Sequence, residues 1–149
     1  MKKILYIINS LAQGGAETHL LQLCKGLNKR DFKLHLCVLF DDQNSGTNKL
    51  FKSLKASKVK IHFLSLKKSN IINVFLSFFK ILKIINLNKF QIIHTHLPRS
   101  DFAGGLIKLF NSKVFWISTL HDAYIKDVYS GYKIYTILKY FYFKADKII

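Results

Sequence analysis

The amino-acid sequence predicts an α/β protein built on a doubly wound, mostly parallel sheet with helices on both faces. Short apolar runs of strand length recur along the chain, and segments with helical periodicity lie between most of them. Several of these runs are apolar throughout instead of alternating, which is typical of parallel strands that helices cover on both sides. The 149 residues, half of them hydrophobic, suffice for one domain with a substantial core.

Five apolar runs are the expected strands, at residues 4–8, 34–40, 59–66, 90–95 and 114–120. The first follows two lysines, as in a secretory signal peptide, but it is too short for one and Asn9 ends it, so we interpret it as a buried strand. Lys80 and Lys83 interrupt the longest apolar segment, which argues against a membrane-spanning helix. Residues 145–149 predict a turn into a sixth strand, which fits either an edge strand or a chain that has been cut short.

Helical periodicity predicts helices at residues 16–28, 71–87, 100–110 and 131–144. In the first, leucines and Cys24 share one face, whereas Glu17 and its polar neighbours are expected mostly outside. Ser100 is the expected N-cap of the third helix, because Asp101 follows in the first turn, where a carboxylate complements the helix dipole. These helices alternate with the strands, so the sheet should be open and doubly wound.

Positive charge is concentrated in one segment of the chain. The net charge is +16, and 22 of the 24 basic residues are lysine. Residues 49–90 hold ten lysines and no carboxylate, which indicates either a solvated face or a surface for an anionic partner. The scarcity of arginine disfavours a nucleic-acid reader. The two cysteines have neither a metal-binding nor a disulfide-framework spacing, which is typical of a reducing compartment.

The first candidate site is the pair Gly14 and Gly15, which separates the first strand from the first helix. Glycine permits a sharp turn and lets a ligand approach the backbone amides, and a helix N-terminus attracts anions. A phosphate site and a purely conformational turn both fit this pair. The spacing matches neither the dinucleotide fingerprint nor the triphosphate-binding loop.

Three histidines supply further candidates at the carboxyl ends of strands, where doubly wound sheets bind ligands. Strand alternation places His94 and His96 on the same side, with His96 nearer the crevice, and His121 follows the fifth strand. We expect His94 to be buried with a backbone hydrogen bond. No third ligand accompanies the His94 and His96 pair in the sequence, so we expect no metal site.

These segments, in this order on an alternating β/α frame, resemble the N-terminal half of a family 4-type retaining glycosyltransferase with the GT-B fold. The resemblance covers essentially the whole chain, and the ordered set is more specific than any one segment. It is carried by residues 3–8, the Gly14–Glu17 turn, the His94–His96 strand end, the Thr119–Asp122 loop and residues 145–149.

The resemblance implies a Rossmann-like domain that mainly binds the acceptor, while a second half binds a nucleotide-diphosphate sugar. It implies that His121 is the catalytic residue, beside the transferred sugar or acceptor, and that no metal or other cofactor is needed. The substrate-binding positions that it implies are Gly14, Gly15, Glu17, His96, Arg99 and Asp101. The acceptor would be a glycan or a lipid-linked molecule, as in cell-surface polysaccharide biosynthesis.

The second half of that family, with its paired glutamates and basic residues for the donor diphosphate, has no counterpart in these residues. We therefore expect the chain alone to lack measurable transferase activity. One alternative is a non-catalytic subunit that a separate donor-binding chain completes. The other is a basic nucleic-acid-binding domain, although we expect no nucleic-acid partner.

The lysine-rich segment has a candidate role by the same resemblance, because relatives with lipid-linked acceptors dock on anionic membranes. We expect a cytoplasmic protein that lies peripherally at the inner face of the membrane. The lysines expected to contact it are Lys49, Lys52, Lys55, Lys58, Lys67, Lys68, Lys80 and Lys83. The aromatic cluster between residues 124 and 143 is expected to pack in the core or against another domain.

Overall fold

The computed structural model describes residues 1–12, 14–27, 31–40, 49–66, 71–121 and 140–149, and it confirms the predicted fold class. The elements in chain order are β1 (Lys2–Ile8), α1 (Gly15–Gly26), β2 (Phe32–Phe40), α2 (Lys49–Ala56), β3 (Lys60–Leu66), α3 (Ile71–Asn88), β4 (Ile92–His96), α4 (Pro98–Phe110), β5 (Phe115–Thr119) and β6 (Lys147–Ile148). The predicted sixth strand is therefore present.

The strands form one six-stranded sheet in the order β3-β2-β1-β4-β5-β6, and every paired strand is parallel. β1 lies between β2 and β4, with Ile8 opposite both Val38 and His96. The direction of winding reverses at this point, which is where doubly wound sheets open a crevice for ligands at the carboxyl ends of their strands.

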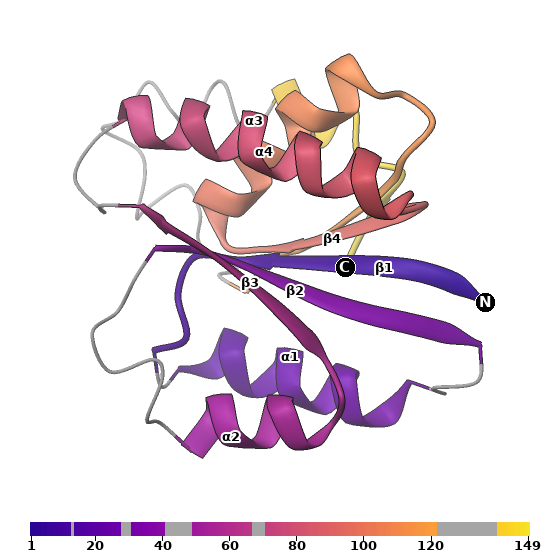
Figure 1. Ribbon diagram of the computed structural model, residues 1–149. Coiled ribbons are helices and arrows are strands. Elements are labelled where there is room, and N and C mark those ends of the chain that lie inside the picture. Colours follow the sequence, from indigo (N-terminus) through magenta and orange to yellow (C-terminus); the bar gives the residue numbers. More distant parts are fainter. Residues whose placement is uncertain (13, 28–30, 41–48, 67–70, 122–139) are drawn as a thin grey trace.

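Two helical layers cover the sheet. α1 and α2 lie on one face, and α3 and α4 lie on the other (Figure 1). Leu20 and Cys24 of α1 pack with Leu36 of β2 in the first layer, whereas Ile81 of α3 packs in the cluster that holds Trp116 of β5 in the second. Burial on both faces explains why the central strands are apolar throughout.

The helix α4, which corresponds to the third predicted helix, begins at Pro98, two residues before the predicted N-cap. Ser100 therefore lies inside the first turn, and its hydroxyl donates to the backbone oxygens of His96 and Leu97. Leu97 takes a left-handed backbone conformation with φ of 83°, which turns the chain sharply from β4 into α4. Proline is tolerated in the first helical turn because backbone N–H groups there have no hydrogen-bond acceptor within the helix, so its lack of an N–H costs little.

The helix α2 was not predicted, and the predicted helix at 131–144 lies mostly outside the described residues. Within the part of the chain that the structure describes, no helix is both long and apolar enough to cross a membrane.

Candidate functional site

The turn before α1 opens onto a cavity at the carboxyl edge of the sheet. Gly14 is the N-cap of α1 and is extended, with φ of −150° and ψ of 177°. A Cβ on Gly14 would lie 2.6 Å from Oε2 of Glu17, whereas a Cβ on Gly15 would meet only open space. The cavity measures about 560 Å³ and is lined by Gly14, Gly15, Glu17, Thr18, His19, Gln22 and Leu50. The structure thus places all three residues predicted in this turn around one cavity.

Glu17 is buried, at 6% exposure, and the prediction that it lies on the outer face of the helix is wrong. Its carboxylate lies against Gly14, so a side chain at that position would have to displace it. Desolvation raises the pKa of Glu17, and a hydrogen bond with its own backbone opposes that rise. A buried carboxyl group therefore lies at the N-terminus of α1, beside the cavity.

His94 and His96 project from the same side of β4, as strand alternation predicted. Their rings stack with centroids 4.4 Å apart. His94 is buried, but its Nε2 contacts Oγ1 of Thr119 at 2.7 Å, so its partner is a side chain and not the predicted backbone group. Burial lowers the pKa of His94 to about 4, with the nearby rings of His19 and His121 adding to the effect. His94 is therefore a neutral packing residue of β4.

His96 joins β4 to the segment that follows β5. It is fully buried, and its Nδ1 lies 3.0 Å from Nε2 of His121. Burial, followed by the neighbouring rings of His94, His121 and His19, lowers the pKa of His96 to about 2. Two of the predicted site residues thus contact one another, with His96 orienting the half-buried His121.

His19 is the site residue that the sequence analysis missed. Its ring packs edge-on against those of His96 and His121, with centroids 5.9 Å and 5.5 Å away. One helical turn after Gly15, it also lines the cavity. The sequence did contain a signal for His19. It lies four residues, about one helical turn, after Gly15, on a helix that begins at the sheet edge where β4 and β5 end.

Asp101 is buried in a hydrogen-bond network, whereas Arg99 is exposed. Asp101 is 1% exposed, and its carboxylate accepts hydrogen bonds from Thr95 at 2.5 Å, Ser118 at 2.8 Å and Tyr142 at 3.0 Å. Burial raises the pKa of Asp101 to about 6, although these three hydrogen bonds oppose the rise.

Arg99 is exposed, with its guanidinium 5.3 Å from the ring centroid of Phe40 at the end of β2. A substrate-binding role stays a prediction for both residues, and the observed role of Asp101 is to join α4, β4, β5 and the C-terminal segment.

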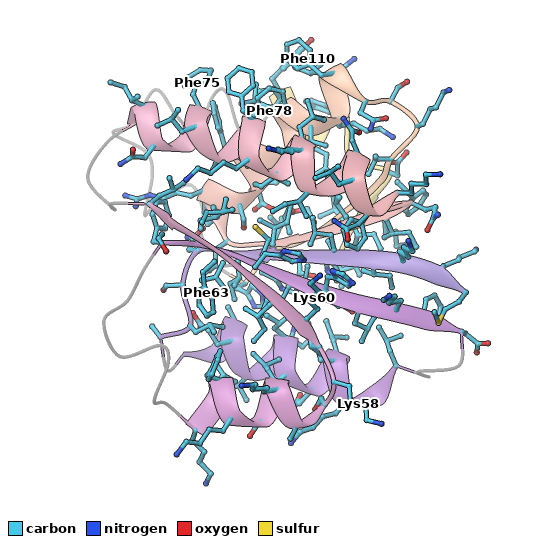
Figure 2. All side chains as sticks on the ribbon, in the orientation of Figure 1. Lys58, Lys60, Phe63, Phe75, Phe78 and Phe110 are labelled. Carbon is cyan, nitrogen blue, oxygen red and sulfur yellow. The ribbon has the colours of Figure 1, made fainter. Side chains whose placement is uncertain are left out.

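The eight lysines predicted to face a membrane do not share one layer. Four of them, Lys49, Lys52, Lys55 and Lys58, are exposed on α2 and the turn after it, whereas Lys80 and Lys83 are exposed on α3 across the sheet. Lys67 and Lys68 lie outside the described residues. Figure 2 shows Phe75 and Phe110 at the outer side of the α3–α4 layer, far from Lys58. The positive surface is therefore divided between two layers.

The chain resembles glycosyltransferases in sequence. Residues 13–149 match the family described as Glycosyltransferase Family 4. The capsular polysaccharide biosynthesis glycosyltransferase CapH from Staphylococcus aureus is 30% identical over 110 residues, which make up 73% of this chain and 27% of CapH. The chain thus spans only about a quarter of the length of this relative.

Solved structures share the fold at lower sequence identity. HepE from Anabaena, solved in complex with UDP and glucose, has a TM-score of 0.73 at 14% identity, over 99% of this chain and 38% of HepE. MnaA from S. aureus, solved with UDP, has a TM-score of 0.71 at 20% identity, over 100% of this chain and 39% of MnaA. MurG from Acinetobacter baumannii has a TM-score of 0.67 at 12% identity, over 99% of this chain and 40% of MurG.

Proposed function

Because this chain belongs to glycosyltransferase family 4, we propose that it is the acceptor-side, N-terminal domain of a retaining glycosyltransferase with the GT-B fold. The completed enzyme moves a sugar from a nucleotide-diphosphate sugar to a glycan or lipid-linked acceptor, at the cytoplasmic side of the membrane. A second, donor-binding half, in the same or a separate polypeptide, is required for activity. The observation that carries the proposal is the convergence of the Gly14–Gly15 turn and the His96–His121 contact on one sheet edge.

The N-terminus of α1 supplies the electrostatic part of the reaction. Transfer of a sugar leaves negative charge on the departing diphosphate, and backbone amides at a helix N-terminus stabilise such charge. Gly15 leaves open space above these amides, which permits close approach of a phosphate or sugar. Glu17 and Thr18 bound the same cavity and supply hydrogen-bonding groups for sugar hydroxyls.

His121 acts at the reacting sugar or at the acceptor hydroxyl. The buried ring of His96 contacts its Nε2 at 3.0 Å and so fixes the orientation of the imidazole. This arrangement matches the general pattern in which a buried group orients a more accessible catalytic one. UDP is bound in the HepE and MnaA structures, which supports a nucleotide-sugar donor for the completed enzyme.

Mapping of amide chemical shifts tests the placement of the site on this chain. Titration with uridine diphosphate glucose, and separately with a glycan acceptor, is expected to shift the amides of Gly15, Ala16 and His121 at millimolar concentration. The amides of β3, at the far edge of the sheet, serve as the internal control. Shifts confined to β3 would contradict the proposed site.

We further propose that the α3–α4 layer contacts an anionic lipid surface, where a lipid-linked acceptor would be presented. The outer side of α3 exposes Phe75, Leu76 and Phe79, with Lys80 and Lys83 next along the helix. Phe110 at the end of α4 is 73% exposed in the same layer. Apolar side chains flanked by lysines are typical of peripheral membrane contact.

Vesicle flotation tests this contact. The chain is expected to float with vesicles that contain phosphatidylserine or phosphatidylglycerol, and less with neutral phosphatidylcholine vesicles or at high salt. Phe79→Ser with Lys83→Gln should reduce flotation, whereas Lys52→Gln with Lys55→Gln on α2 is the matched control in the opposite layer. Equal flotation with neutral and anionic vesicles, or loss only in the α2 variant, would contradict the proposal.

A further inference from the structure

Three imidazoles from distant parts of the chain meet at the sheet edge. His19 comes from α1, His96 from the end of β4 and His121 from the segment after β5. One ring nitrogen of each lies within 4.8 Å of those of the other two. His96 is fully buried, while His19 and His121 are half-buried, so the cluster is reached from the side of the cavity that His19 lines.

We propose that His19, His96 and His121 form a three-histidine site for a divalent transition-metal ion of the zinc class. The proposal does not depend on the transferase function, because it rests only on the positions of these three rings. Three imidazoles plus one solvent-derived ligand make up a common four-coordinate arrangement for such ions, with the fourth position open to the cavity.

The spacing of the nitrogens suits this ion. Metal–nitrogen bonds of about 2.0 to 2.1 Å in tetrahedral geometry place the nitrogens roughly 3.3 Å from one another. Nδ1 of His96 and Nε2 of His121 are already 3.0 Å apart. The ring nitrogens of all three histidines lie within 4.8 Å of one another, so a small rotation of the half-buried His19 ring would bring them to this spacing.

The hydrogen bonding of the cluster is incomplete without a ligand. Nδ1 of His19 is buried and has no hydrogen-bond partner among the described residues. Buried ring nitrogens are normally satisfied, so each such atom calls for an explanation.

The ligand set determines which ions bind. All three ligands are neutral nitrogen donors, which suit zinc, cobalt, nickel or copper, whereas magnesium and calcium require oxygen ligands. Stacking of His94 on His96, and contact of His94 with Thr119, fix the buried ring that anchors the site. Metal binding would join α1, β4 and the segment after β5 at one point.

Metal titration of the purified chain tests the proposal. Isothermal titration with zinc chloride is expected to give one equivalent bound, and cobalt chloride should produce visible absorption bands of a tetrahedral complex. Magnesium chloride should give no binding. His19→Gln and His121→Gln are each expected to weaken zinc binding at least roughly tenfold, because each removes one of three ligands.

The chain offers a matched control in a second histidine pair. Nδ1 of His35 contacts Nε2 of His62 at 2.9 Å in the β2–β3 region, with only two imidazoles. His62→Gln should leave zinc binding unchanged. His19→Gln changes a half-buried side chain, so circular dichroism should show an intact fold. Absence of zinc binding, or undiminished zinc binding in His19→Gln and His121→Gln, would overturn the proposal.

Discussion

At the residue scale, the two ends of α1 carry glycines with different expected roles. A Cβ on either Gly15 or Gly26 would meet no atom within 4 Å, so alanine fits at both without internal clashes. Neither substitution should lower the free energy of unfolding, because alanine is the better helix former by about 0.5–1 kcal/mol.

We predict that Gly15→Ala weakens binding of uridine diphosphate glucose by about tenfold, or about 1.4 kcal/mol, because the new methyl group obstructs approach to the amides. Gly26→Ala, at the far end of the same helix, is the control and should bind as the wild type does. The measurement is a shift titration of both variants alongside thermal unfolding. Equal affinity of the two variants for uridine diphosphate glucose would show that Gly15 is not part of the binding site.

Asp101 is the residue whose loss should cost the most stability in the site. Three hydroxyl donors converge on its buried carboxylate. We predict that Asp101→Ala lowers the free energy of unfolding by about 2–4 kcal/mol, because the donors are left buried without an acceptor. Asp101→Asn retains one acceptor oxygen and should cost less. Urea denaturation compares the two, and a loss below about 0.5 kcal/mol in Asp101→Ala would show that the network is not structural.

At the element scale, α4 approaches the sheet closely enough that one glycine is obligatory. A Cβ on Gly104 would lie 2.7 Å from Nε1 of Trp116 and 2.9 Å from Cγ2 of Thr95. Trp116 is fully buried, so it cannot move aside. We predict that Gly104→Ala costs about 1–3 kcal/mol in the free energy of unfolding, as overpacked cores do. Thermal unfolding measures this, and a variant as stable as Gly26→Ala would contradict the described packing.

The His35–His62 pair should make stability depend on pH. Burial lowers the pKa of His35 to about 4, and His62, Lys60, Lys33 and Lys3 reinforce the shift in that order. Below the ordinary value of 6.5 the unfolded chain takes up a proton that the folded chain does not. The contribution of His35 to stability is therefore present above pH 6.5 and is lost as the pH falls from 6.5 towards 4.

We predict that the urea midpoint of the wild type falls between pH 7.5 and pH 5, and that His35→Leu reduces this fall. Asp101 acts in the opposite direction, because its raised pKa favours the folded state at low pH. The difference between wild type and His35→Leu at each pH isolates the contribution of His35. Parallel pH profiles for the two proteins would show that His35 does not titrate as described.

Most elements were predictable because their patterns are local. The strands and the helix α3 follow from runs of apolar residues, and the structure bounds α3 at Ile71–Asn88 where the sequence predicted 71–87. The short helix α2 was missed because only Leu54 of its eight residues is buried. The start of α4 was misplaced because the side chain of Ser100 bonds backward to β4 instead of capping the helix.

The candidate site was predictable only in part, for a related reason. His94, His96 and His121 were predicted because side chains alternate along a strand and because the apolar runs show where the strands end. Both features are local in the sequence. His19 required knowledge that the second turn of α1 packs against the ends of β4 and β5, which is a tertiary contact. The burial of Glu17 also depends on tertiary packing, because helical periodicity alone does not show that it lies against Gly14.

At the scale of the whole molecule, the proposed function makes this chain one side of a reaction centre. The matches cover 27% of CapH and 38% of HepE. The cavity at the carboxyl edge is where a second domain would enclose a sugar between two halves. We therefore expect turnover to require a second, donor-binding half.

The most direct test measures release of the nucleotide diphosphate in three preparations: the chain alone, the chain combined with a donor-binding half, and that combination carrying His121→Ala. A library of nucleotide sugars and lipid-linked acceptors supplies the substrates. We predict no turnover by the chain alone, acceptor-dependent turnover once the donor-binding half is added, and a loss of at least about a hundredfold in His121→Ala. Turnover by the isolated chain, or undiminished turnover in His121→Ala, would contradict this prediction.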